Sequence, residues 1–385
     1  MNFRLLQLEK TSKMVNTLDD FIKENEIRIG EGKDFTTTPP LYYQSLNDAF
    51  YNYFKTVRNN KDTYHFLLDF KSWSRKDVAF NFSNTDSAVF AILGFHRFFE
   101  LLIKDILRRI NQFLAVKFPD NEEDAIKFLN QELESEIMET VEFRKAFERF
   151  KEAIKYQNKN PNKIEYSIIQ QFSFLNDDTL NRLSRWRNRI MHNGSTIPNI
   201  YLLDYLVSQK IIPLVDTVVE TDKDILKSYR PHYFETLTGI KIIEEIKKIK
   251  FDFRDFSNEN KGNELALKIL RLAHLKELGR ATYNLEFTMK NNISYYDPYY
   301  KDPIGRNKRF AEQEKSHPSF YANKKCPCCG FDTLVVYRSE FDDIFTKKKD
   351  FISWFNCFTC SYSLKNNLGD PEYFGYSSEK LFATQ

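Results

Sequence analysis

Apolar positions along this chain recur mainly with the spacing of a helix rather than with the alternation of a strand. The run at residues 88–107 is apolar on most sides, which predicts one long, largely buried helix. Further helices are expected at 142–155, 164–175, 177–193, 198–219, 240–249 and 264–278. Short runs at 333–338 and 351–355 favour strands. The pattern therefore predicts a mainly α fold with a small β module near the C-terminus.

The length of 385 residues predicts two to three domains. The expected divisions are 1–78, a mixed, partly helical N-terminal region; 79–222, a helical domain; 223–310, a helical region with a linker; and 311–385, the β module.

The first residues lack the apolar core of a signal peptide, and no apolar run is long enough to span a bilayer. We therefore expect a cytoplasmic protein without a membrane partner. The net charge of +3 is too small to indicate nucleic-acid binding by itself.

The helix expected to begin near Asp177 carries an arginine inside its apolar face. At about 100° per residue, that face holds Leu180, Leu183, Trp186, Ile190 and Met191. Arg187 lies within the same arc, where a guanidinium is costly unless it is paired or functional. Asn193 and Gly194 predict the helix end, which places His192 in the last turn. Because histidine moves protons near neutral pH and arginine binds phosphate oxygens, Arg187 and His192 are expected to converge on one phosphate.

The segment Arg187-Asn188-x3-His192 resembles the signature of the HEPN superfamily, in which an arginine, often followed by asparagine, precedes a histidine. The resemblance covers about residues 80–222. It implies a helical bundle that forms a homodimer and cleaves RNA without a metal. His192 would transfer protons as the ribose 2′-hydroxyl attacks the phosphate, Arg187 would stabilise the developing charge, and Asn188 would orient the site. The products would be 2′,3′-cyclic phosphate and 5′-hydroxyl ends, as expected of an antiphage defence or toxin effector.

The run at 88–107 resembles the first helix of that superfamily, which carries an acidic residue. Two interpretations of Glu100 stand: it supports the site by pairing with Arg187, or it lies at the edge of the buried face. His96, on the same side, is expected to be a core histidine.

Basic side chains are expected to contact RNA. They are Arg182, Arg185 and Arg189 on the motif helix, and those of residues 301–325.

All five cysteines follow residue 325. Cys326 and Cys329 form one Cys-x2-Cys pair, and Cys357 and Cys360 form another, which predicts a tetrahedral Zn²⁺ site. A disulfide scaffold is the alternative, but nothing else in the chain indicates secretion. Cys328 is expected to point away from the metal. The module resembles a zinc ribbon, so we expect structural zinc and no catalytic metal.

These patterns together predict a metal-independent endoribonuclease of the HEPN type that acts on RNA as a homodimer. A regulatory protein is a further expected partner. The alternative function is a non-catalytic, dimeric HEPN-like adaptor that binds nucleic acid or protein through its zinc ribbon. RNA cleavage in the presence of EDTA separates the two.

Overall fold

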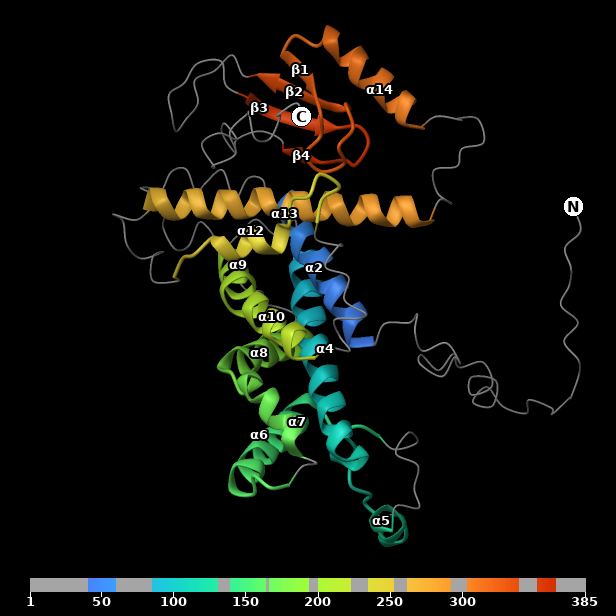
Figure 1. The fold of residues 1–385 in the computed structure, drawn as a ribbon, viewed down its shortest axis with the longest axis vertical. Helices are drawn as coiled ribbons and strands as arrows, with labels where there is room; N and C mark the ends of the chain where they lie inside the picture. The colour runs from blue at the N-terminus through green and yellow to red at the C-terminus, as the bar shows by residue number, and fades with distance from the viewer. Residues whose placement is uncertain are drawn as a thin grey trace, which may run out of the picture.

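The computed structural model describes residues 41–59, 85–130, 139–163, 166–193, 200–222, 235–252, 262–291, 303–338 and 352–364. This part of the chain is mostly helical, with a four-stranded antiparallel sheet near the C-terminus (Figure 1). The coarse prediction of a mainly α fold with a small β module is therefore confirmed. The predicted cap at Gly194 and the helix start at Pro198 lie outside the described residues. Among those described, no helix is long and apolar enough to cross a membrane.

Helix α4 (Thr85–Ile110) is the long buried helix that the apolar run predicts. Asp86 in its first turn and Arg108 and Arg109 in its last turn complement the helix dipole. Helix α2 (Leu41–Asn59) packs along α4 so closely that a Cβ on Gly94 would lie 2.8 Å from the Cβ of Ala49. Glycine is therefore the residue that permits this approach, and the expected N-terminal region contributes α2 to the same core as α4.

Shorter helices continue the bundle around α4. They are η4 (Gln112–Ala115), α5 (Glu122–Leu129), α6 (Phe143–Lys159), α7 (Ser167–Gln171), η6 (Ser173–Leu175), α8 (Asp178–Asn193), α9 (Ile200–Leu206), the π-helical η7 (Val207–Ile211) and α10 (Ile212–Thr221). The helix predicted over 164–175 is split into α7 and η6, and the one predicted over 198–219 contains a π-helical turn. Local apolar spacing does not specify such interruptions.

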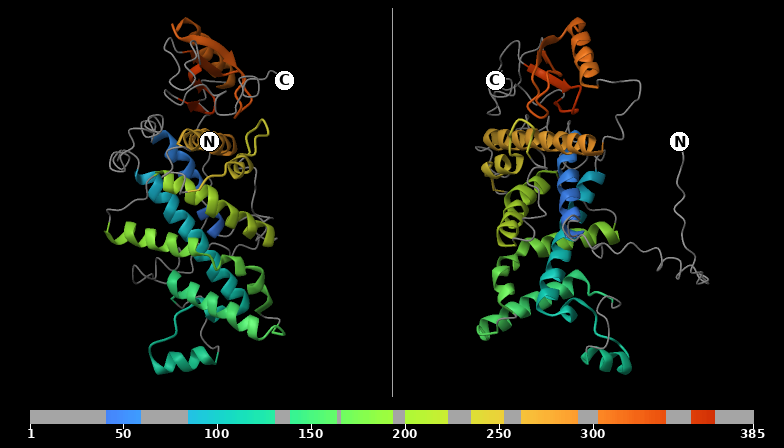
Figure 2. Two further views of the ribbon diagram at one scale, coloured as in Figure 1. Left: turned by 90° about the vertical axis from the view of Figure 1, so that its left-hand side faces the viewer. Right: turned by 45° about the vertical axis from the view of Figure 1, so that its right-hand side comes forward.

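Helix α13 (Gly262–Asn291) crosses the end of the bundle and separates it from the sheet, with the shorter α12 (Ile242–Lys248) beside it (Figures 1 and 2). It runs well past the predicted end at residue 278. Its central turns are buried on nearly all sides, and a Cβ on Gly279 would lie 2.6 Å from the Phe54 ring of α2. The buried face also holds Lys276, whose Nζ lies 2.7 Å from Oδ1 of Asp204 with both side chains fully buried.

The sheet has the order β1-β2-β3-β4, formed by β1 (Phe320–Lys324), β2 (Leu334–Arg338), β3 (Ile352–Cys357) and β4 (Ser363–Leu364). Its inner face joins the main core through Leu334 and Val336. On the other face Val335 and Tyr337 pack with Ala311 of α14 (Pro303–Gln313), which is followed by η11 (Glu314–Ser316). The sequence indicated only a basic stretch where α14 lies. One hydrophobic cluster thus extends from α2 through α13 into the sheet, and the predicted domain boundaries stay predictions.

Candidate functional sites: the α8 motif and the four-cysteine centre

Helix α8 begins within one residue of its predicted start. Oδ1 of Asp177 accepts a hydrogen bond from the backbone N–H of Thr179 at 2.6 Å, which caps the first turn. The apolar face packs against α4 through buried Leu180 and Leu183, and Trp186 and Ile190 pack partly buried on the core. Met191 was expected on the same face, but its side chain is 56% exposed. The buried part of this face therefore does not include Met191, although Ile190 beside it packs partly buried on the core.

Arg187 is half-buried on α8, and its Nη1 donates a hydrogen bond to Oδ1 of Asn188 at 3.0 Å. The guanidinium lies near His96 of α4. Burial lowers the pKa of His96 to about 4; Glu100 opposes that shift, and the charge of Arg187 adds to it. The His96 ring packs edge-on against Phe143 at a centroid distance of 4.6 Å. His96 is therefore a neutral core histidine at physiological pH, as expected.

Glu100 takes its contacts from α4 itself. Its Oε1 lies 2.7 Å from Nζ of Lys104, and its Oε2 lies 3.7 Å from Nδ1 of His96. Nζ of Lys104 also donates to the hydroxyl of Thr140 at 3.3 Å. Among the described contacts of Glu100 there is none with Arg187. These contacts fit the interpretation that Glu100 lies at the edge of the buried face. A pairing of Glu100 with Arg187 stays a prediction.

The other candidate site residues of α8 face solvent. His192 is exposed in the last turn and makes no hydrogen bond or ion pair with the described residues. Arg182 donates to Asp178 at 2.7 Å, and Nη2 of Arg185 lies 3.8 Å from the same carboxylate. These arginines lower the pKa of Asp178. Arg189 is exposed as well. The structure thus brings Arg187 and Asn188 together, while the convergence of Arg187 and His192 on a phosphate stays a prediction.

Four cysteines form a buried cluster at the end of the sheet nearest α13. The sulfurs of Cys326, Cys329, Cys357 and Cys360 all lie within 4.8 Å of one another. The Sγ atoms of Cys326 and Cys360 are 3.6 Å apart, as are those of Cys329 and Cys357. Bonds of about 2.3 Å to a tetrahedral zinc require sulfurs about 3.8 Å apart. The predicted set of ligands is therefore placed so that it can hold a metal ion.

The two halves of this centre have the same backbone form. The amide of Cys328 donates to Sγ of Cys326, and the amide of Thr359 donates to Sγ of Cys357, each at 3.4 Å. Each turn ends on a residue with positive φ, Gly330 at 75° and Ser361 at 61°. Burial raises the pKa of the Cys326 and Cys360 thiols well above the ordinary value, whereas hydrogen bonds from the other three cysteines lower the pKa of Cys357. A bound cation would stabilise all four sulfurs as thiolates.

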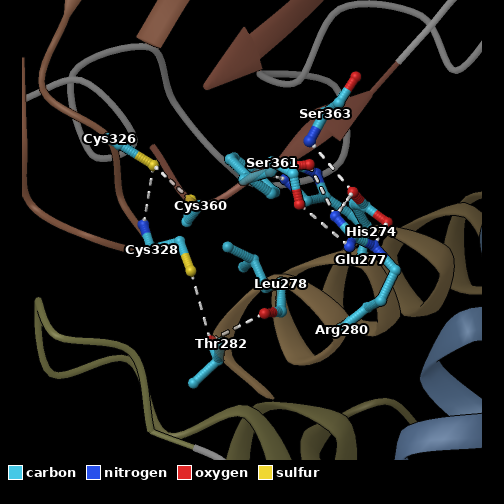
Figure 3. Close-up of polar contacts among 11 residues, drawn as sticks. His274, Glu277, Leu278, Arg280, Thr282, Cys326, Cys328, Cys360, Ser361 and Ser363 are labelled. Carbon is cyan, nitrogen blue, oxygen red and sulfur yellow. Dashed lines mark hydrogen bonds and ion pairs between the residues drawn. The ribbon is translucent and has the colours of Figure 1, made fainter. Parts of the chain in front are cut away.

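Cys328 points away from this cluster. Its Sγ lies 3.4 Å from the hydroxyl of Thr282 on α13 (Figure 3). In the same turn, the carbonyl of Cys328 accepts from the amide of Leu237 at 2.9 Å, and the carbonyl of Pro327 accepts from the hydroxyl of Thr238. The first cysteine turn is therefore held against both α13 and the segment that precedes α12.

The second cysteine turn meets a buried polar network on α13, which sequence reasoning missed. Arg280 makes two hydrogen bonds to the carboxylate of Glu277, at 2.6 and 2.7 Å, and its Nη2 donates to the carbonyl of Ser361 at 2.7 Å (Figure 3). Glu277 also accepts from the amide of Ser363 at 3.1 Å, and His274 hydrogen-bonds the hydroxyl of Tyr362. The sequence signal that could have revealed this network is the presence of Glu277 and Arg280 among apolar residues at the end of the predicted helix.

Comparisons with protein-family models, curated proteins and solved structures found no match to this chain. A functional assignment therefore depends on the residues themselves.

Proposed function

We propose that this chain is an endoribonuclease that cleaves RNA without a catalytic metal. The observation that carries the proposal is the arrangement of α8, where a guanidinium hydrogen-bonded to Asn188 and an exposed histidine occupy the last two turns. Arg182, Arg185 and Arg189 add positive charge along the exposed part of the same helix. Positive charge, a proton carrier and solvent access are what phosphate transfer within RNA requires.

The proposed reaction needs two proton transfers. The 2′-oxygen attacks the adjacent phosphorus as a base removes its proton, and the bond to the 5′-oxygen breaks as an acid protonates that oxygen. The products are a 2′,3′-cyclic phosphate and a 5′-hydroxyl. His192 supplies proton transfer, and Arg187 stabilises the negative charge on the phosphorus oxygens. Asn188 restrains the guanidinium through its hydrogen bond.

A homodimer fits this chemistry, because one chain contributes one Arg187 and one His192. A two-fold axis near the end of α8 would place two such pairs in one cleft. Large apolar side chains are exposed nearby in sequence, Met191 at 56% and Leu202 at 42%. We expect sedimentation to show a dimer, and Met191→Glu to weaken it. An active, stable monomer would refute this part of the proposal.

We further propose that the four-cysteine centre holds Zn²⁺ in a structural role. Four thiolates complete a tetrahedral shell, so the ion has no open position at which to bind and activate water. The exposed basic side chains of α14, Lys308 and Arg309, are available for RNA contact beside this module.

The decisive experiment compares a single-stranded RNA with the same strand lacking 2′-hydroxyls, in EDTA, with the protein carrying its zinc. The RNA should be cut to cyclic-phosphate and 5′-hydroxyl ends, and the deoxy strand should stay intact. A requirement for Mg²⁺, or 5′-phosphate products, would contradict the mechanism.

The alternative is a non-catalytic adaptor that binds nucleic acid or protein. One observation favours it: no described residue orients His192, whereas catalytic histidines are ordinarily held by a third group. RNA binding without cleavage, unchanged by His192→Ala, would support the adaptor.

A further inference from the structure

A groove of about 670 Å³ runs along one side of α6, built without residues of α8 or of the four-cysteine centre. Its wall consists of four basic side chains, two glutamates and two tyrosines from α6 and its neighbours, with Leu114 from η4 and Ala153. Small-molecule sites typically enclose about 300–1,000 Å³. The groove is therefore large enough for a ligand of nucleotide size.

Arg149 is the most constrained cation in this groove. Its Nη1 donates to the carbonyl oxygens of Leu114 and Val116, both at 2.8 Å, which fixes the plane of the guanidinium. The side chain is half-buried, and no carboxylate among the described residues forms an ion pair with it. Burial accordingly lowers the pKa of Arg149. The donors on Nε and Nη2 are left to bind an anion through the planar fork that suits phosphate.

The two glutamates of the groove already have cationic neighbours. Glu152 lies 2.7 Å from Nζ of Lys155, and Glu148 lies 3.2 Å from Nε of Arg144 and 3.8 Å from Nζ of Lys145. Lys159 has no acidic side chain at ion-pair distance among the described residues. Arg149 and Lys159 thus give the groove its uncompensated positive charge.

An aromatic surface lies beside this charge. Tyr156 is 43% exposed, and its ring lies 4.9 Å from that of Tyr166 with an angle of 48° between the planes. Exposed aromatic faces bind nucleobases by stacking and show little sequence preference. A groove that combines a fixed guanidinium, a lysine and an exposed tyrosine therefore matches a ligand that has both a phosphate and a base.

We propose that the α6 groove binds a nucleoside phosphate, with its phosphate at Arg149 and Lys159 and its base against Tyr156. The same chemistry is present in a residue of an RNA strand and in a free nucleotide. The proposal does not depend on cleavage by α8, so each can fail without the other.

The test titrates the full-length, zinc-loaded protein by calorimetry with 5′-AMP, with inorganic phosphate and with a short 2′-O-methyl oligoadenylate that cannot be cleaved. AMP should bind more tightly than phosphate. Tyr156→Ala and Lys159→Ala should each weaken AMP binding about tenfold, in the range of one lost stacking or charged contact. Lys127→Ala, which removes a half-buried cation of α5 that pairs with Glu123 outside the groove, should bind AMP like the original protein, and thermal unfolding should confirm that the variants fold.

If the oligonucleotide competes with AMP and loses affinity in the same variants, the natural source is an RNA strand. If AMP alone depends on these residues, the source is a free nucleotide. Unchanged AMP binding in Tyr156→Ala, Lys159→Ala and Arg149→Lys overturns the proposal, as does the absence of AMP binding or an affinity for phosphate equal to that for AMP. His192→Ala should leave the AMP titration unchanged, so a failure of the nuclease proposal is visible separately.

Discussion

The four-cysteine centre and the α8 motif were both predicted from short sequence motifs, but among the described residues the fold brings together all the predicted members of only the first. The cysteine turns are far apart along the chain, with Cys357 28 positions after Cys329, yet their sulfurs meet in a buried cluster. Arg187 and His192 are five positions apart on one helix, yet His192 faces solvent with no described partner. The distance between two residues along the chain therefore does not determine whether their side chains meet in the fold.

The difference in burial follows from the ligand that each site is expected to bind. A metal ion is enclosed by its ligands, so the chain must bring all four sulfurs together and bury them. A phosphate in a long RNA must reach its site from outside, so the side chains that handle it stay at the surface. The four cysteines come together within one chain, whereas in our proposal the α8 site needs both RNA and a second copy of the chain.

The largest expected effect comes from breaking the buried centre. Cys326→Ser should abolish metal binding and unfold the sheet, because binding of structural zinc supplies about 10–16 kcal/mol to small modules of this kind. Metal analysis and hydrogen exchange measure both outcomes. Cys328→Ser is the matched control, since its sulfur contacts Thr282 and is not one of the four clustered sulfurs, and it should retain its metal. Loss of metal from Cys328→Ser with retention in Cys326→Ser would reverse the ligand assignment.

Zinc removal also tests whether the sheet is independent of the bundle. Because Ser361 and Ser363 bind Arg280 and Glu277, loss of the second cysteine turn should raise hydrogen exchange in the middle of α13 as well. Unchanged protection of α13 in metal-free protein would show that the bundle does not need the sheet.

On α8 the expected loss is of catalysis rather than of fold. His192→Ala should lower RNA cleavage by about two to four orders of magnitude, the usual range for lost acid–base catalysis. Thermal stability should hardly change, because the side chain is exposed. Glu122→Ala, an exposed substitution on α5 away from the motif, should keep full activity. Full activity of folded His192→Ala would remove the catalytic assignment.

Another prediction concerns acid stability at the contact between α4 and α8. The pKa of His96 is 6.5 in the unfolded chain and about 4 in the fold, so between these values the unfolded state binds more protons. Stability from this group is therefore present above pH 6.5 and is lost as pH falls toward 4, by about 3 kcal/mol in total. Urea unfolding at pH 7 and pH 4.5 should show this loss in the original protein, and a smaller loss in His96→Phe. Equal losses in both would contradict a buried, neutral His96.

The smallest expected effect separates charge from geometry at Arg187. Arg187→Lys keeps the positive charge but loses the planar fork and the hydrogen bond to Asn188 in its present form. Cleavage should fall about a hundredfold, the scale of one lost donor to transition-state charge. Single-turnover rates at saturating RNA measure the effect. A lysine variant as active as the original would mean that only the charge of Arg187 matters.

The sequence by itself determined those features that depend on local periodicity and on side-chain chemistry. Apolar spacing predicted α4 and the bounds of α8, because a helix that buries one face needs that spacing. Paired Cys-x2-Cys motifs predicted the four-cysteine cluster, because few other arrangements of thiols in a reduced protein recur at that spacing.

Only the tertiary structure determined which side chains from distant segments contact each helix and strand. Met191 is 56% exposed although it lies on the same predicted arc as Leu180 and Leu183, and Lys104 of α4 donates to Thr140, which is 36 positions away in the chain. Helix α14 covers the outer face of the sheet with Ala311, a contact between residues distant in sequence. Likewise Arg280 and Glu277 of α13 are buried where Ser361 and Ser363 supply hydrogen-bond partners. Local patterns do not encode such contacts, since each depends on where another segment of the chain packs.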